Sequence, residues 1–285
     1  MKKLFLLSVT LAALVLLVGG QTNAGYMIKS HEAAAPAAKK MPPPAGASTY
    51  ALVAWTELGM HCIDGKDYSI FSVLPPFNVI HAQLIQKTEP PVLISTGVTI
   101  TYQATTDTTG SYNSSSAAKT NFWTYVRTLF LNSVPPETGL AGYKTQSATP
   151  QSMTYNTTEG YWEAVGIPTV PYDDKSKFNA YSMAKLVATD SKGTVLATST
   201  VVLSVSDEMS CSVCHASNSD VNAKPAAGWV NNSDAAKDTK LNILRKHDDR
   251  WPISQYLSQL QTNGYTYQAS LYDTANGGTA VLFLP

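Results

Sequence analysis

Three side chains in the last third of the sequence have the types and spacing to hold a metal cofactor. The motif Cys211-Ser212-Val213-Cys214-His215 places two thiols three residues apart, with an imidazole directly after the second thiol. On one helical turn, two such thiols can form thioether bonds with the two vinyl groups of a haem, and the histidine can bind the iron axially. The motif therefore predicts covalent attachment of haem c through Cys211 and Cys214, with His215 as the proximal iron ligand.

Two other functions of a paired-cysteine motif fit this sequence less well. A structural zinc site needs a second pair of Cys or His residues at ligand spacing, and none follows the motif. A thioredoxin-type dithiol opens a helix after a strand in an α/β fold, and the flanking sequence does not have that pattern. Haem attachment is therefore the preferred interpretation.

The side of the iron opposite His215 needs a second protein ligand if the haem is six-coordinate. His247 is the first candidate, because helical spacing places it beside Ile243 and Leu244 in an apolar stripe. A histidine in such a stripe is otherwise a core or interface residue. His61 is the second candidate for a metal ligand, and the weaker candidates are His81, His31, Met60 and Met209.

Cys62 is the one cysteine outside the motif. We interpret it as a buried free thiol at the end of a strand, because unpaired cysteine is among the most buried residue types. One alternative is a copper site with His61 and His81, although the spacing is not that of a typical cupredoxin loop. Another is calcium binding by Asp64 and Asp67, but the sequence DGKD is usually a plain turn.

The first residues have the composition of a secretory signal peptide. Lys2 and Lys3 precede an apolar run over residues 4–18, and small residues lead to Ala24. A membrane-spanning helix needs about 20 apolar residues, so cleavage after Ala24 is preferred to a membrane anchor. The sequence therefore predicts an exported protein, periplasmic, on the outer surface or extracellular, with no transmembrane span after cleavage.

Composition excludes two other classes of protein. The 20 Lys and Arg residues balance 20 Asp and Glu residues, so the chain lacks the positive surplus of a nucleic-acid-binding protein. Three cysteines are too few for a disulfide framework.

The remaining elements must position the motif, and the first of them are strands. Residues 25–49 are rich in Ala and Pro, which is typical of an extended tether. Residues 50–206 contain about seven short runs of strand type, such as 98–104, in which alternate residues are apolar. A polar, Gly-containing turn at 190–193 joins two of these runs. The pattern predicts a mainly β fold, an antiparallel immunoglobulin-like sandwich.

Helices are predicted in two places. Residues 121–132 have apolar side chains at helical spacing, so a short helix should cover the sandwich. Residues 207–285 are predicted to be a small helical haem-binding segment. Within it, Ser233 or Asp234 can cap a helix that runs to about residue 249, and Pro252 can open a second helix that stops at Gly264.

Several strings resemble the exported multihaem c-type cytochromes of metal-reducing bacteria. They are CSVCH at 211–215, LGMHC at 58–62, DYSIFSVLPPFNVIHAQL at 67–84, GWV at 228–230 and LNILRKHD at 241–248. The resemblance implies an immunoglobulin-like domain before the haem region, two histidine ligands on the iron and a low redox potential. This chain departs from the family in having one C-x-x-C-H motif, which suggests either a truncated gene product or a reduced monohaem member.

The sequence therefore predicts an exported electron carrier with one covalently bound haem, rather than a catalyst. Its expected partners are redox proteins, among them other multihaem cytochromes. Two alternatives remain open. One is a surface β-sandwich binding module with an unused haem motif. The other is a haem enzyme with an open distal site, for which the sequence supplies no arranged acid and base pair.

Overall fold

The computed structural model describes residues 48–57, 65–205 and 210–282, all within one compact unit that spans Gly46–Pro285. Within these ranges, no helix is long and apolar enough to cross a membrane. Several predictions fall outside the described residues: the signal peptide, most of the tether, and the roles considered for His31, Met60, His61, Cys62, Asp64 and Met209.

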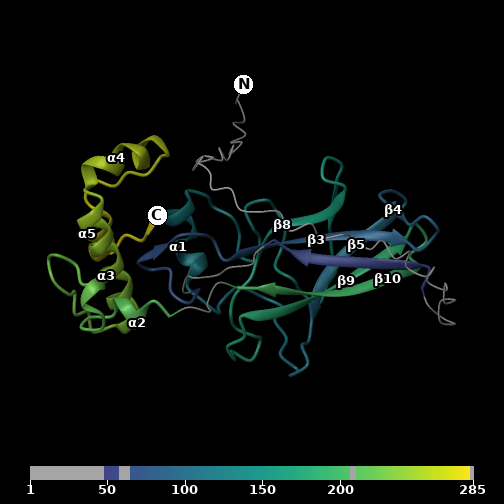
Figure 1. Ribbon diagram of the computed structural model, residues 1–285, viewed down its shortest axis with the longest axis horizontal. Helices are drawn as coiled ribbons and strands as arrows, with labels where there is room; N and C mark the ends of the chain where they lie inside the picture. The colour runs from purple at the N-terminus through teal and green to yellow at the C-terminus, as the bar shows by residue number, and fades with distance from the viewer. Residues whose placement is uncertain (1–47, 58–64, 206–209, 283–285) are drawn as a thin grey trace, which may run out of the picture. The chain divides into compact units, whose positions relative to one another are not determined.

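Two antiparallel sheets dominate the described chain, which confirms the prediction of a mainly β fold with a few helices (Figure 1). The first sheet contains, in order, β1 (Tyr50–Thr56), β3 (Phe77–Gln86), β8 (Tyr161–Pro168) and β7 (Thr154–Asn156), and β4 (Val92–Ile94) also pairs with β3. The second contains, in order, β10 (Val195–Ser204), β9 (Tyr181–Asp190), β5 (Val98–Thr105) and β6 (Gln151–Ser152).

Both sheets contribute alternate residues to one hydrophobic core. In β5, Ile100, Tyr102 and Ala104 are buried, so the alternation predicted for this run is confirmed. The first sheet contributes Ile80 and Leu84 from β3 to the same cluster. Burying a side chain of this size stabilises a fold by about 1.5–3 kcal/mol, so the shared core holds the two sheets together.

The turn between β9 and β10 has the structure that its sequence predicts. The Asp190 carboxylate accepts hydrogen bonds from the backbone amides of Lys192 at 2.9 Å and Thr194 at 2.8 Å. Gly193 has φ of 82°, a left-handed conformation in which a side chain is strained. The two strands it joins pair in antiparallel register.

The predicted helix over 121–132 is present as α1 (Phe122–Phe130). Its buried side chains, Phe122, Val126 and Leu129, have helical spacing. They pack against Tyr68 and Ala280. The helix therefore contacts chain segments before β2 (Phe71–Ser72) and near the end of the described residues.

The helical part begins with α2 (Ser212–His215), followed by a 3₁₀ turn at Val221–Ala223, α3 (Ala235–Arg250), α4 (Ile253–Thr262) and α5 (Leu271–Asn276). Asp234 caps α3, because its carboxylate accepts from the amides of Ala236 at 3.0 Å and Lys237 at 3.2 Å. Pro252 precedes α4, as predicted. α5 is an element that the sequence analysis did not predict.

A second hydrophobic core joins these helices to a segment far away in the sequence. It contains Leu241 and Leu244 of α3 together with Ile70 and Phe71. The last strand, β11 (Val281–Leu282), pairs in parallel with β2. Residues from the range predicted to be the sandwich therefore take part in the core of the helical part.

The Glu137 carboxylate fixes a loop before β6 and gives a pH-dependent prediction. It accepts hydrogen bonds from the Ser116 amide at 2.8 Å and the Ala117 amide at 2.7 Å. Burial raises the pKa of Glu137, but hydrogen bonds from Thr145, Ala117 and Ser116 more than offset it and hold the pKa below its ordinary value. A lowered carboxyl pKa stabilises the fold above the ordinary value, and this contribution is lost as the pH falls through the folded-state value.

We expect Glu137→Gln to lower the free energy of unfolding by about 2 kcal/mol at pH 7. The deficit should shrink as the pH falls from above the ordinary pKa of glutamate through the lower folded-state pKa, because wild-type Glu137 becomes protonated over this range. Urea unfolding at several pH values measures both effects. Glu159→Gln is the control, because Glu159 is exposed. A deficit that stays constant over this pH range would contradict the prediction.

Candidate functional site

Residues 211–215 form a single helical turn. The α2 helix begins after Cys211, and the His215 amide donates a hydrogen bond to the Cys211 carbonyl oxygen at 2.9 Å. Cys214 and His215 come three and four positions after Cys211, so the side chain of each is a neighbour of the Cys211 side chain on the turn. Cys214 is exposed, and Cys211 and His215 are half-buried. Local structure thus brings the three predicted cofactor-binding residues together.

The His215 imidazole is partly withdrawn from water. Its Nδ1 atom is buried and has no hydrogen-bond partner in the described part of the chain. Burial lowers the pKa of His215, and the nearby charge of Lys246 lowers it further, while Asp220 acts in the opposite direction. A lowered pKa favours the neutral ring, which offers a nitrogen lone pair to a metal.

A buried carboxylate on α3 holds the chain that follows the motif. Asp238 is 5% exposed and accepts hydrogen bonds from the Ser217 amide and hydroxyl, both at 2.7 Å. It also accepts from the Asn232 amide at 2.8 Å. Asn242, one turn later on α3, donates to the Ser217 hydroxyl at 3.1 Å. These bonds fix α2 against α3, and the two helices lie together in Figure 1.

Two valines, one inside the motif and one six residues after it, are strongly exposed. Val213 is 74% exposed and Val221 is 78% exposed, the highest values among the large apolar side chains of the described residues. An exposed apolar side chain between the two cysteines, as Val213 is, suits an apolar macrocycle bound there. The residues present therefore fit a covalently attached haem, with Cys211 and Cys214 as anchors.

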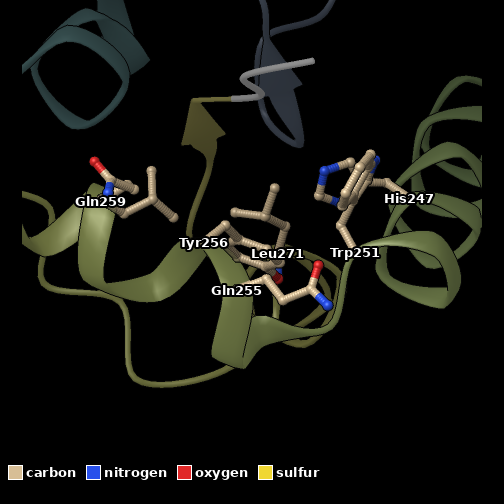
Figure 2. A pocket seen from close by; sticks show the side chains of 7 residues that line it. His247, Trp251, Gln255, Tyr256, Gln259 and Leu271 are labelled. Carbon is tan, nitrogen blue, oxygen red and sulfur yellow. The ribbon is translucent and has the colours of Figure 1, made fainter.

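His247 is the preferred candidate for the iron ligand opposite His215. It lies on α3, beside one carboxylate and two aromatic side chains. Its Nδ1 atom lies 3.0 Å from a carboxylate oxygen of Asp248, and its ring centroid is 5.4 Å from that of Tyr256. Figure 2 shows it at one end of a pocket, beside Trp251. The structure thus places His247 among residues of α3, α4 and α5.

The two candidate iron ligands have different neighbours on α3. His215 lies near Lys246, and His247 is the next residue along the helix. Ligation of one iron by both histidines stays a prediction.

His81 lies in the first sheet and is 2% exposed. Its Nε2 atom lies 2.9 Å from the Glu57 carboxylate, and its ring packs edge-on against Tyr161 with centroids 4.4 Å apart. The Trp55 ring is adjacent to both, with its centroid 5.5 Å from that of His81 and 5.6 Å from that of Tyr161. These contacts place His81 in an aromatic cluster of the sheet. Its predicted partners for a copper site, His61 and Cys62, lie outside the described residues.

Sequence reasoning missed two groups of residues that shape this region. One is the Asp238 network, and the other is the pocket at His247 with its neighbour Asp248. The capping pattern of α3 was visible in the sequence, but the partner of Asp238 lies 21 residues earlier. Among residues 48–57, 65–205 and 210–282, no group of three or more His, Cys, Asp or Glu side chains is placed to hold a metal ion.

Comparisons of this chain with protein-family models, with curated proteins and with solved structures found no match.

Proposed function

We propose that the protein is an exported electron carrier with one haem c, attached to Cys211 and Cys214 and ligated by His215. The observation that carries the proposal is the helical turn at 211–215, in which Cys214 and His215 follow Cys211 at the three- and four-residue spacing of helical neighbours. The C-x-x-C-H motif is a strong signal for haem attachment, and the turn has the local geometry that the attachment needs.

The chain's own residues would hold the cofactor and control its surroundings. A bound haem would supply one-electron redox chemistry. Cys211 and Cys214 would fix its position through two covalent bonds, and His215 would supply the proximal nitrogen. The Asp238 network would keep the turn in place, because it ties Ser217 to α3. The exposure of Cys214 and Val213 supports electron exchange with a partner at the surface.

The strand order supports an immunoglobulin-like sandwich for the β region. In immunoglobulin domains one sheet has strands in the order A-B-E-D and the other contains G, F and C, to which variable domains add C′. Here the order is β1-β3-β8-β7 in one sheet and β10-β9-β5-β6 in the other. Both orders are reproduced by one assignment in chain order: β1 is A, β3 is B, β5 is C, β6 is C′, β7 is D, β8 is E, β9 is F and β10 is G. In this proposal the sandwich is a spacing or docking module.

The first test is an intact mass and a visible spectrum of the protein exported by a host with c-type haem maturation. We expect a mass increase of one haem per chain and a sharp reduced α band. Resistance of that band to carbon monoxide would identify a six-coordinate carrier, whereas rapid binding would favour an enzyme with an open distal site. An apo mass without haem absorbance would overturn the proposal in favour of the β-sandwich binding module.

Export is tested in the same sample. We expect the amino terminus of the mature protein to be Gly25, because the signal peptide is predicted to be cleaved after Ala24. Recovery of full-length protein from the cytoplasm, with Met1 or Lys2 at its amino terminus, would contradict this part of the proposal.

A further inference from the structure

A groove of about 490 Å³ is formed by the end of α1 and by the chain segment that follows α4. From the first part it is lined by Arg127 and Thr128 of α1 and by Leu131, directly after the helix. Residues 264–268 line it from the second part. Small-molecule sites in proteins have volumes of about 300–1,000 Å³, so the groove is large enough for one.

Buried contacts hold the two parts of the groove together. The Tyr265 hydroxyl donates a hydrogen bond to the Leu129 carbonyl oxygen of α1 at 2.8 Å, and both residues are buried. Gly264 lies so close to the end of α1 that a Cβ atom on it would be 3.2 Å from the Cδ1 atom of Leu131. The shape of the groove is therefore set by the fold itself.

Arg127 gives the groove a positive charge that no carboxylate balances. It has the only charged side chain among the described residues that line the groove. Within residues 48–57, 65–205 and 210–282, its guanidinium makes no ion pair and no side-chain hydrogen bond. Burial raises the pKa of Tyr265 and raises that of Tyr267 to about 12, so neither phenol adds negative charge at neutral pH. The groove therefore favours an anion over a cation.

Main-chain amides add further hydrogen-bond donors to the same groove. Residues 266–268 lie outside any helix or strand, and their backbone amides make no hydrogen bond within the described chain. Thr128 and Thr266 are exposed, and their hydroxyls have no partner there either. A guanidinium and a backbone amide can only donate, whereas a hydroxyl can donate and accept. The groove therefore suits an anion that carries several oxygen atoms.

The geometry points to a binding site for a sugar acid, a hydroxylated ring with one carboxylate. The carboxylate would lie on Arg127, because the planar guanidinium can donate to both carboxylate oxygens at once. The ring oxygens would accept from the amides of residues 266–268, and the carbon skeleton would cover Leu131, which is 48% exposed. The inference goes beyond the proposed electron carrier and does not depend on haem attachment.

The test is equilibrium dialysis of the mature chain against D-glucuronate and against D-glucose, which has the same ring without the carboxylate. We expect D-glucuronate to bind about tenfold tighter, because only it can pair with Arg127. Arg127→Gln should remove this preference, weakening D-glucuronate about tenfold and D-glucose less than about twofold. Arg127→Lys keeps the charge without the two-pronged geometry and should restore part of the preference.

Arg250→Gln is the matched control, because Arg250 is also an exposed arginine and lies outside the groove. It removes the same charge and should change both affinities less than about twofold. Arg127 is exposed as well, so its variants should keep the thermal unfolding temperature of the wild type. Absence of saturable binding of D-glucuronate by the wild type, equal affinities for the two sugars, or equal losses in Arg127→Gln and Arg250→Gln would overturn the proposal.

Nuclear magnetic resonance shows where the sugar acid binds. We expect the amide resonances of residues 266–268 to shift as D-glucuronate is added to the wild type, and to shift less in Arg127→Gln at the same concentration. Shifts confined to other parts of the chain would overturn the assignment to this groove. A wild-type protein without haem would contradict the proposed electron carrier and leave this result unaffected.

Discussion

Replacing Cys211 and Cys214 together with alanine is expected to abolish covalent haem attachment. Each thiol forms one of the two thioether bonds in the proposed site, and without both of them no covalent bond remains. After denaturation and removal of free haem, the wild type should keep its visible absorbance, and the double variant should lose essentially all of it. Intact mass measured on the same samples should show the loss of one haem per chain.

The third cysteine supplies the matched control. Cys62→Ala also removes a thiol, but Cys62 is not part of the motif, so this variant should carry haem at the wild-type level. Retention of haem by the double variant after denaturation would contradict the attachment site. Loss of haem from Cys62→Ala would show that a third thiol is needed.

Replacing Asp238 with alanine is expected to cause the largest loss of stability, about 3 kcal/mol in the free energy of unfolding. The carboxylate is 5% exposed and accepts from the amides of Ser217 and Asn232. Hydrogen bonds to charged groups each contribute about 1.5–3 kcal/mol, and donors left buried without a partner add a penalty. Urea unfolding measures the change, and faster amide exchange at Ser217 and Asn232 should localise it.

Two variants show whether this loss arises from the buried network. Asp238→Asn keeps one acceptor oxygen and should cost less than Asp238→Ala. Asp234→Ala removes an exposed cap of the same helix and should cost about 1 kcal/mol, a typical value for a helix cap. Equal losses in Asp238→Ala and Asp234→Ala would mean that the network adds nothing beyond an ordinary helix end.

Features that depend on neighbouring residues were predictable from the sequence. The alternation in β5, the turn at Gly193 and a helix cap at Ser233 or Asp234 each involve contacts over a few positions. The first two predictions are confirmed, and the structure gives the cap to Asp234. The turn at 211–215 is equally local, because its hydrogen bonds span three or four residues. Such patterns appear directly in the order of residues.

The surroundings of the candidate site depended on contacts that no local pattern encodes. Phe71 and Ser72 pair with Val281 and Leu282, more than 200 positions later, and Ile70 and Phe71 enter the core of the helices. Sequence analysis assigned His247 to an apolar stripe, but it could not show that α4 and α5 complete a pocket around it.

The difference between the features that the sequence predicted and those that only the tertiary structure showed has a physical cause. Main-chain geometry and residue type determine helical turns, caps and the alternation of strands, so the sequence alone defined the C-x-x-C-H turn and the β character of the chain. The positions of α2 and the pocket depend on which residues meet from separate parts of the chain, such as Ser217 with Asp238 and Tyr272 with Asp248. Those pairings are selected by burial and hydrogen bonding over the whole fold, and only the tertiary structure decided them.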